Sequence, residues 1–208
     1  APKLSAAEQR LLTLAGTNSD KMLALVNNLL DFQNLEQERI ATDAAPVEFV
    51  ALVREVMEEH RPSAEDKGIY LRHCGDAAPV LVRGDAKRLK QAIGQLLSNA
   101  VKFSHEGGYV ELSARLVDGC AMLEVRDYGV GIPEGERNQI FGKFTQVDNS
   151  DCRNFDGSGL GLSIARQIIE DHGASIDFDS TLGEGTRFFA VFPLCDTEDN
   201  ISIELPQM

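Results

Sequence analysis

The chain has 208 residues, of which 43% are hydrophobic and 25% charged, enough apolar material for one ordinary domain with an additional segment. Its formal net charge of -13 disfavours extended contacts with nucleic-acid phosphates or anionic lipid headgroups. The four cysteines, Cys74, Cys120, Cys152 and Cys195, form no C-x-x-C pair, so the sequence predicts no zinc site and favours reduced thiols.

The first predicted element is a long helix over residues 5 to about 41. Apolar side chains recur at three- and four-residue steps from Leu11 to Phe32, and no proline interrupts them. This periodicity fits equally well an amphipathic helix packed on a globular core and a bundle or dimerisation helix. The segment T-D-A-A-P at residues 42–46 then predicts a linker.

The remaining sequence mixes helical and strand patterns. Helices are predicted over residues 47–67, 85–103 (with Asp85 as N-cap) and 159–172. Strands are predicted over residues 69–74, 80–84, 174–180 and 185–193, and a β-hairpin over residues 107–127. Because consecutive strands pair as hairpins, we expect an α+β fold with helices layered on one face of a mixed, mostly antiparallel sheet. The polar, acidic stretch 196–208 is typical of a disordered tail.

One face of the helix predicted over residues 85–103 carries the first candidate site. Gln95, Asn99 and Lys102 lie at positions i, i+4 and i+7 and therefore share a face. The opposite, apolar face is made by Ile93, Leu96, Leu97 and Ala100. A solvated face usually carries Lys and Glu, so two amides beside a lysine favour a ligand surface. An asparagine oxygen suits Mg²⁺, and a lysine can hold phosphates as a point charge.

The second candidate is the segment V-R-D-Y-G-V-G-I-P, in which a predicted strand ends at Asp127. Gly129, Gly131 and Pro133 are typical of a plain strand-exit turn. Such glycines also allow a planar base to approach the backbone closely. An ionised Asp127 would then accept a hydrogen bond from an exocyclic amine, which adenine carries at its six position and guanine does not.

The third candidate is the glycine-rich start of the helix predicted over residues 159–172. Gly157, Gly159 and Gly161 predict either a flexible helix entry or a phosphate site at the helix N-terminus. Their spacing matches neither G-x-G-x-x-G nor a Walker A loop, which disfavours Rossmann and P-loop sites.

Between these two glycine segments lies I-F-G-K-F-T-Q-V-D-N-S-D-C-R-N-F-D. It contains Phe141 and Phe144 among polar residues, and Arg153 near its end. The segment reads either as a surface loop that buries two aromatic rings or as a lid that closes over a nucleotide.

In this order and spacing, the segments resemble the catalytic domain of sensor histidine kinases. Q-L-L-S-N-A-V-K-F resembles the N box, D-Y-G-V-G-I-P the first glycine box, I-F-G-K-F-T-Q-V-D the F box, G-S-G-L-G-L-S-I-A the second glycine box, and G-E-G-T-R-F-F-A-V-F-P the final strand. The resemblance covers about residues 47–194, and the combination of motifs is highly specific. It implies the Bergerat (GHKL) fold, a two-layer α/β sandwich that binds ATP. N-N-L-L-D-F-Q-N-L-E-Q-E-R-I also resembles the end of the second dimerisation helix in such kinases.

The resemblance implies a role for each matching residue. Asn99 would hold Mg²⁺, and Lys102 would lie near the ATP phosphates. Asp127 would bind adenine, with Thr186 supporting it through water. The other residues implied at the nucleotide are Gln95, Phe103, Gly129, Gly131, Ile132, Arg153, Gly157, Ser158, Gly159, Leu160, Gly161 and Leu162.

The resemblance also divides the chain. Residues 1–42 would be the second helix of a dimerisation and phosphotransfer hairpin, residues 43–46 a linker, residues 47–195 the ATP-binding catalytic domain and residues 196–208 the tail. The implied activity is that of a histidine kinase in a two-component phosphorelay, which transfers the γ-phosphate of Mg²⁺·ATP to a histidine. The implied partners are a histidine-bearing dimerisation helix and a response regulator receiver domain, and not nucleic acid. The parent protein is expected to be a homodimer whose kinase portion is cytoplasmic, in a bacterial sensor kinase that is compatible with a membrane anchor.

None of the four histidines lies on the first predicted helix. His60, His73, His105 and His172 all read as structural, and His172 would be a cation favoured at a helix C-terminus. We therefore expect the phosphoacceptor outside these residues, and we expect the chain to bind ATP without phosphorylating itself.

Two positions depart from the family pattern. Gln95 stands where the N box usually has asparagine, and its longer side chain predicts a displaced metal or water shell. Asp156 stands where glycine is frequent, a milder change. The alternative function is therefore a nucleotide-binding interaction module of a kinase that has lost turnover. Other proteins with this nucleotide fold, such as anti-sigma kinases, chaperones and mismatch-repair ATPases, fit less well because the F box and the dimerisation-helix match argue against them.

Overall fold

The structure, a computed structural model, describes residues 44–75, 78–137, 139–142 and 159–195, with scattered positions between Ser5 and Leu23. The chain divides into two compact units, Ala1–Glu38 and Arg39–Met208. In the first unit, the described positions from Glu8 to Leu23 are helical. Ser5 Oγ donates to Glu8 Oε2 at 2.7 Å and accepts from Glu8 N at 3.3 Å, which is the pattern of a helix N-cap. The rest of the predicted first helix and the acidic tail lie outside the described residues.

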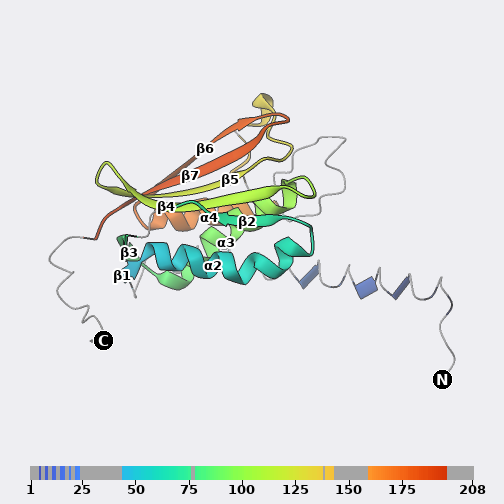
Figure 1. Cartoon of the computed structure of the whole chain (residues 1–208), viewed down its shortest axis with the longest axis horizontal. Helices are drawn as coiled ribbons and strands as arrows, with labels where there is room; N and C mark the ends of the chain where they lie inside the picture. The colour runs from blue at the N-terminus through green and yellow to red at the C-terminus, as the bar shows by residue number, and fades with distance from the viewer. Residues whose placement is uncertain are drawn as a thin grey trace, which may run out of the picture. The chain divides into compact units, whose positions relative to one another are not determined.

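The second unit is built on a five-stranded sheet in the order β2-β4-β5-β7-β6. The strands are β2 (Tyr70–His73), β4 (Tyr109–Val117), β5 (Cys120–Asp127), β6 (Ser175–Thr181) and β7 (Gly185–Pro193). Strand β2 runs parallel to β4, and the other neighbours are antiparallel. Helices α2 (Phe49–Glu65), α3 (Ala86–Phe103) and α4 (Gly161–Asp171) cover one face of this sheet, as Figure 1 shows. The predicted two-layer α+β fold is confirmed.

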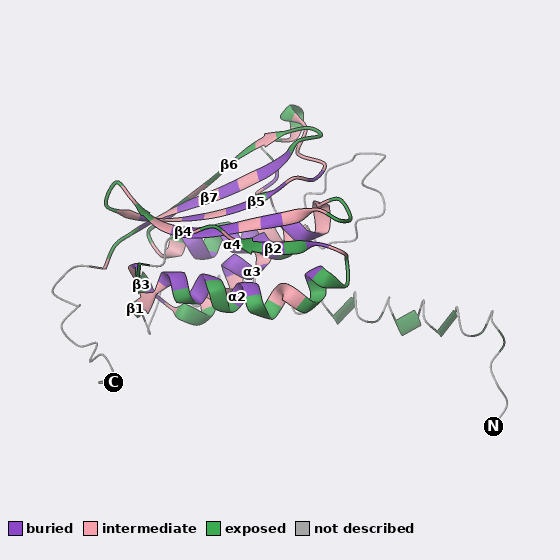
Figure 2. Ribbon diagram, in the orientation of Figure 1, coloured by how far each residue is buried: buried purple, intermediate pink, exposed green. Residues whose placement is uncertain are grey.

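The core lies between the sheet and the three helices, where the buried residues gather (Figure 2). Strand alternation points every second side chain of β4, β5 and β7 toward the helices. The predicted apolar face of α3 packs against them: Ile93, Leu96, Leu97 and Ala100 are each at most 1% exposed. Burying one such side chain contributes roughly 1.5–3 kcal/mol, so this layer supplies much of the driving force for folding.

The predicted linker is partly a strand. Ala45 and Pro46 begin β1 (Ala45–Glu48), which pairs antiparallel with β3 (Leu81–Gly84) in a separate two-stranded sheet. Proline is tolerated because β1 is an edge strand, where a missing N–H costs little. The next helix starts at Phe49, two residues later than predicted, because the Glu48 carboxylate caps it by accepting from Val50 N and Ala51 N.

Helices α2 and α3 pack closely where a glycine faces a histidine. A Cβ at Gly94 of α3 would lie 3.2 Å from Cε1 of His60 on α2, so glycine leaves the room that the ring occupies. His60 Nδ1 lies 2.9 Å from the carbonyl oxygen of Val56. The predicted structural role of His60 agrees with this packing. Pro62 lies inside α2 without ending it.

The expectation that His172 is a cation at a helix end does not hold. Its Nδ1 lies 2.6 Å from the Ile168 carbonyl oxygen, which can only accept, so Nδ1 carries a proton. Its Nε2 accepts from Asp85 N at 3.0 Å and therefore carries none. His172 is consequently neutral, and it ties the end of α4 to the start of α3.

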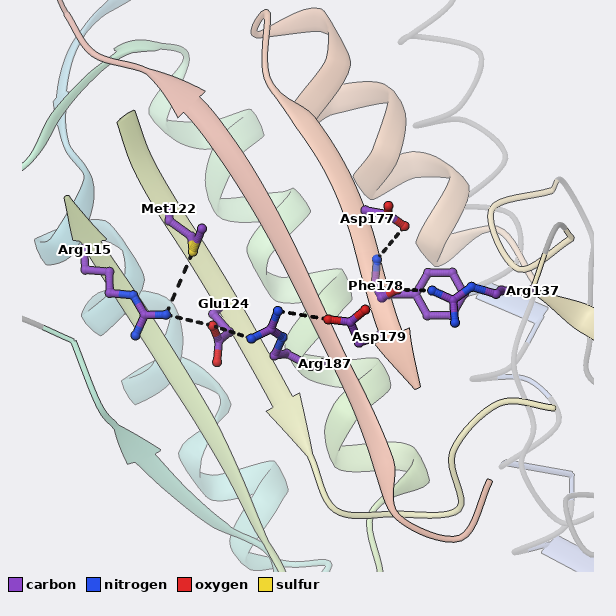
Figure 3. A network of polar contacts seen from close by, with 8 residues as sticks. All are labelled: Arg115, Met122, Glu124, Arg137, Asp177, Phe178, Asp179 and Arg187. Carbon is purple, nitrogen blue, oxygen red and sulfur yellow. Dashed lines mark hydrogen bonds and ion pairs between the residues drawn. The ribbon is translucent and has the colours of Figure 1, made fainter. Parts of the chain in front are cut away.

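The face of the sheet opposite the helices carries a row of ion pairs, drawn in Figure 3. Arg115 on β4 lies 3.0 Å from Glu124 on β5, and Arg187 on β7 reaches both Glu124, at 3.7 Å, and Asp179 on β6, at 2.9 Å. These pairs hold four strands together across the open face. The polar residues at the end of β5, at the end of β6 and at the start of β7, described below, lie on the other face, against the helices.

Candidate nucleotide site

At the end of β5, a carboxylate takes the place of a core residue. Ala121, Leu123 and Val125 point toward the helices and are at most 1% exposed. Asp127 is the next inward position of the same strand and is only 4% exposed. A carboxylate buried to this extent is costly unless its hydrogen bonds are satisfied or it serves a ligand.

Backbone groups hold one oxygen of this carboxylate. Asp127 Oδ1 accepts from Gly129 N at 3.0 Å and from Thr186 N at 3.2 Å. Burial raises the pKa of Asp127 to about 6, although the two N–H groups and the charge of His105 act in the opposite direction. Both hydrogen bonds described for Asp127 fall on Oδ1.

The two glycines of the first glycine box pass very close to other backbone segments. A Cβ at Gly129 would lie 1.9 Å from the carbonyl oxygen of Phe103, at the end of α3. A Cβ at Gly131 would lie 2.1 Å from the carbonyl oxygen of Thr181, and Gly131 has a φ of +68°. The approach of the protein's own backbone therefore requires glycine at both positions, a reason that the sequence did not indicate.

Val130, between these glycines, is hydrogen-bonded to two other backbone segments. Val130 N donates to the carbonyl oxygen of Phe103 at 3.2 Å, and Gly183 N donates to the carbonyl oxygen of Val130 at 2.8 Å. The loop after β5 is thus fixed between the end of α3 and the turn that joins β6 to β7.

A chain of hydroxyl contacts fixes the far end of the same loop. Thr186 Oγ1 on β7 lies 2.9 Å from Ser180 Oγ on β6. Ser180 Oγ also accepts from Ile132 N at 2.8 Å. Asp127, Thr186 and Ile132, which come from three segments of the sequence, are therefore joined in one network.

The amide and lysine face of α3 is arranged as predicted, with Gln95, Asn99 and Lys102 half-buried. The Gln95 side chain reaches the first residue of α4: a Cβ at Gly161 would lie 2.6 Å from Gln95 Oε1. Lys102 Nζ lies 4.6 Å from the centre of the Phe103 ring, a cation–π distance. Helix α3 therefore touches both glycine boxes, since Gln95 in its middle meets Gly161 and Phe103 at its end meets Gly129.

The start of α4 has a glycine entry and an apolar N-cap residue. Gly159 has a φ of +68°, and Leu160 is 1% exposed. Leu160 provides no side-chain cap for the first N–H groups of α4. Uncapped N–H groups at a helix N-terminus favour an anion.

The first phenylalanine of the F box is anchored to the sheet. The Phe141 ring lies 5.9 Å from that of Phe178 and 6.2 Å from that of Phe188, both edge-on. The Arg166 guanidinium of α4 lies 5.3 Å from the centre of the Phe141 ring. Phe141 thus packs where β6, β7 and α4 meet, and Phe144 lies outside the described residues.

A family model described as "Histidine kinase-, DNA gyrase B-, and HSP90-like ATPase" matches residues 84–196 of this chain. The chain belongs to this ATPase family. Among curated proteins, it is 35% identical over 179 residues to a circadian input-output histidine kinase, CikA, of Synechococcus elongatus. That match covers 85% of this chain and 24% of the relative, so the chain spans about a quarter of the curated relative's length.

Two solved structures share the fold. Full-length ShkA in complex with AMPPNP is 32% identical with a TM-score of 0.77, over 93% of this chain and 40% of that one. The mycobacterial sensor histidine kinase MprB is 31% identical with a TM-score of 0.63, over 73% of this chain and 97% of that one. The predicted kinship with ATP-binding catalytic domains of histidine kinases is confirmed. None of the helices in the described part of the chain is both long and apolar enough to cross a membrane.

Within this ATPase fold, the described part of the chain brings half of the predicted site residues into contact. The glycine-box loop, Asp127 and Thr186 form one cluster, and Phe103 adjoins it. Gln95 and Gly161 form a second contact. Asn99, Lys102, Gly159, Leu160 and Leu162 lie on the same two helices or at their ends. Arg153, Gly157 and Ser158 lie outside the described residues.

Two residues of the cluster were missed by the sequence reasoning. A Cβ at Gly185 would lie 2.2 Å from the carbonyl oxygen of Asp127, so glycine lets β7 approach the end of β5. Ser180 connects Thr186 to Ile132. A signal for Ser180 was present, because the predicted turn near residue 183 places residue 180 opposite Thr186 in the hairpin.

Proposed function

We propose that this chain is the ATP-binding part of a sensor histidine kinase, which binds Mg²⁺·ATP for transfer of its γ-phosphate to a histidine of the parent protein. The observation that carries the proposal is the buried carboxylate of Asp127, with one oxygen held by two backbone N–H groups. A carboxylate fixed in this way is suited to accept a hydrogen bond from the exocyclic amine of adenine. The AMPPNP bound by ShkA supports an adenine nucleotide.

The phosphates would lie toward the face of α3 and the start of α4. Lys102 supplies a positive charge, and the first turn of α4, whose N-cap residue Leu160 provides no side-chain hydrogen bond, supplies N–H donors. Gly159 and Gly161 are half-buried at this helix start. Arg153, Gly157 and Ser158 are proposed to complete this end of the site.

The residues present fit a magnesium ion that is held mainly by phosphate oxygens. Within the described residues, no group of three or more His, Cys, Asp or Glu side chains could hold a metal ion by itself. Mg²⁺ needs few protein ligands when phosphates and waters complete its shell, and Asn99 offers one neutral oxygen on the α3 face. A bound Mg²⁺ would neutralise phosphate charge, while the chain's own residues orient the nucleotide.

The proposed reaction is an in-line displacement at the γ-phosphorus by an imidazole nitrogen, with ADP as the leaving group. The role of this chain is to hold the nucleotide in the correct orientation. No histidine occurs in the first unit, Ala1–Glu38, and His60 and His172 are held in structural contacts. The acceptor histidine is therefore proposed on another helix of a homodimeric parent kinase, which would pass the phosphate to a response regulator in the cytoplasm.

The binding half of this proposal is tested by titrating the 208-residue chain with ATP and with GTP in the presence of Mg²⁺, using calorimetry. We expect ATP to bind and GTP to bind at least tenfold more weakly. Asp127→Asn should abolish most of the affinity. Asp118→Asn makes the same chemical change in the exposed β4–β5 turn, where a φ of 50° also suits asparagine, and should change nothing. Equal affinity for both nucleotides would contradict the proposal.

The transfer half is tested with ATP labelled at the γ-phosphate. The 208-residue chain should acquire no acid-labile label, whereas the full-length protein should acquire it. Label on the chain alone would refute the assignment of the acceptor to another segment.

The alternative is an ATP-binding interaction module without turnover, and Gln95 is the observation that favours it. Its side chain extends to Gly161 at the start of α4, where a Cβ would lie 2.6 Å from Oε1. The full-length protein discriminates the two functions. If it binds ATP and forms no phosphohistidine while its Gln95→Asn variant does, the alternative is correct.

A further inference from the structure

Ser180 Oγ lies at the junction of three segments next to the proposed adenine site. It accepts from Ile132 N at 2.8 Å, donates to the carbonyl oxygen of Gly185 at 2.9 Å, and lies 2.9 Å from Thr186 Oγ1. These contacts connect the first glycine box to both strands of the β6–β7 hairpin. A serine hydroxyl has one proton and two lone pairs, so three contacts use its whole capacity.

The directions of these hydrogen bonds can be assigned one by one. The Ile132 N–H can only donate, so it occupies one lone pair of Ser180 Oγ. The Gly185 carbonyl oxygen can only accept, so it receives the Ser180 proton. The contact with Thr186 must then use the second lone pair of Ser180, which makes the Thr186 hydroxyl the donor.

This assignment fixes what Thr186 offers to a ligand. Its proton points at Ser180, and its backbone N–H is already bonded to Asp127 Oδ1. Toward a nucleotide or a bound water, Thr186 Oγ1 therefore presents lone pairs only. Asp127, to which Thr186 is bonded through its backbone, is also an acceptor when ionised.

We propose that Ser180 is a positioning residue that directs the Thr186 hydroxyl away from the nucleotide and so makes the Asp127–Thr186 edge of the site acceptor-only. This inference rests on the proposed function and deepens it. An acceptor-only edge selects a base that presents a donor there, such as the exocyclic amine of adenine. It rejects a base that presents a carbonyl there, as hypoxanthine does, because two acceptors would face each other without a proton between them.

The test compares the affinities of the 208-residue chain for ATP and for inosine triphosphate, which differ in the group at the six position of the base. The wild-type chain should prefer ATP. Ser180→Ala frees the Thr186 hydroxyl to turn its proton toward the base, so the preference should fall by about tenfold, the effect of roughly one hydrogen bond. Ser175→Ala, an exposed serine on the same strand, should leave it unchanged.

A double-mutant cycle separates positioning from a general loss of structure. In a Thr186→Val background no hydroxyl remains to be directed, so Ser180→Ala should weaken ATP and inosine triphosphate by the same factor. If Ser180→Ala weakens both nucleotides equally in the wild-type background as well, Ser180 is merely structural and the inference is overturned. If the alanine variant does not fold, Ser180→Cys replaces it in the test, because cysteine has nearly the volume of serine. This variant should also lower the preference for ATP over inosine triphosphate.

The outcomes also distinguish the inference from the function on which it rests. Failure of the wild-type chain to bind ATP would overturn both. ATP binding with a preference that Ser180→Ala does not change would overturn only the role of Ser180.

Discussion

Replacing Asp127 by asparagine should raise the stability of the fold and lower its affinity for ATP. The asparagine oxygen can still accept from Gly129 N and Thr186 N, which now bond to Oδ1. The substitution therefore keeps the local structure and removes only the buried charge. Most destabilising variants lower binding and stability together, so changes of opposite sign are diagnostic.

The stability change follows from the pKa of Asp127. Its ordinary value of 3.8 rises to about 6 in the folded chain, chiefly because of burial. The folded state thus binds the proton more tightly than the unfolded state, so wild-type stability should fall as the pH rises from about 4 through about 6. At about 1.4 kcal/mol per pKa unit, the ionised carboxylate costs on the order of 3 kcal/mol at pH 8. Asp127→Asn avoids this cost and should be more stable than the wild type at pH 8 by about 1–3 kcal/mol.

The affinity change has the opposite sign. Asparagine would direct an NH₂ group at the adenine amine, so a charge-assisted hydrogen bond is replaced by two facing donors. The loss should reach about 3 kcal/mol, or roughly a hundredfold in Kd. Wild-type affinity should itself fall about tenfold at pH 5, where about one Asp127 in ten is ionised, and this dependence should be absent in the variant.

Thermal unfolding at pH 5 and pH 8, combined with calorimetric titration of ATP at the same pH values, measures both quantities. Asp118→Asn is the matched control for both. A destabilising buried charge at Asp127 is contradicted if Asp127→Asn lowers Tm at pH 8 while it weakens ATP binding, or if the difference in Tm between variant and wild type is the same at both pH values.

The remaining predictions concern the glycines. Gly129→Ala should lower the free energy of unfolding by about 3 kcal/mol or more, because its Cβ would lie 1.9 Å from the Phe103 carbonyl oxygen. The control Gly135→Ala, which has nothing within 4 Å of its Cβ, should change it by less than about 0.5 kcal/mol. Similar Tm values for the two variants would contradict the close approach of Gly129 to Phe103. Gly161→Ala should displace the Gln95 side chain and weaken ATP. In a double-mutant cycle, Gly161→Ala should weaken ATP binding less in a Gln95→Asn background, because the shorter asparagine side chain leaves room for the new methyl group. Additive effects of the two substitutions would exclude a contact between residues 95 and 161.

The sequence alone predicted the elements of the catalytic unit well, since burial leaves a local periodicity. The helix from Ala86 to Phe103, its Asp85 cap and the β4–β5 hairpin fall where the pattern placed them. The misplaced elements have non-local causes. Ala45 and Pro46 join a strand because β3 offers an edge to pair with, and His172 stays neutral because Asp85 N, from the start of another helix, donates to it.

The motifs likewise indicated Asp127 and Thr186, since the order and spacing of functional boxes are properties of the sequence. Only the tertiary structure decided how they act together. Strand register places Ser180 opposite Thr186, and Thr186 N donates to Asp127 Oδ1, although 59 residues separate Asp127 from Thr186. The requirement for glycine at Gly129 and Gly131, and the direction of the Thr186 proton, depend on which backbone carbonyls approach within hydrogen-bonding or contact distance. Those approaches are set by packing between segments that are distant in the sequence, so local sequence patterns do not predict them.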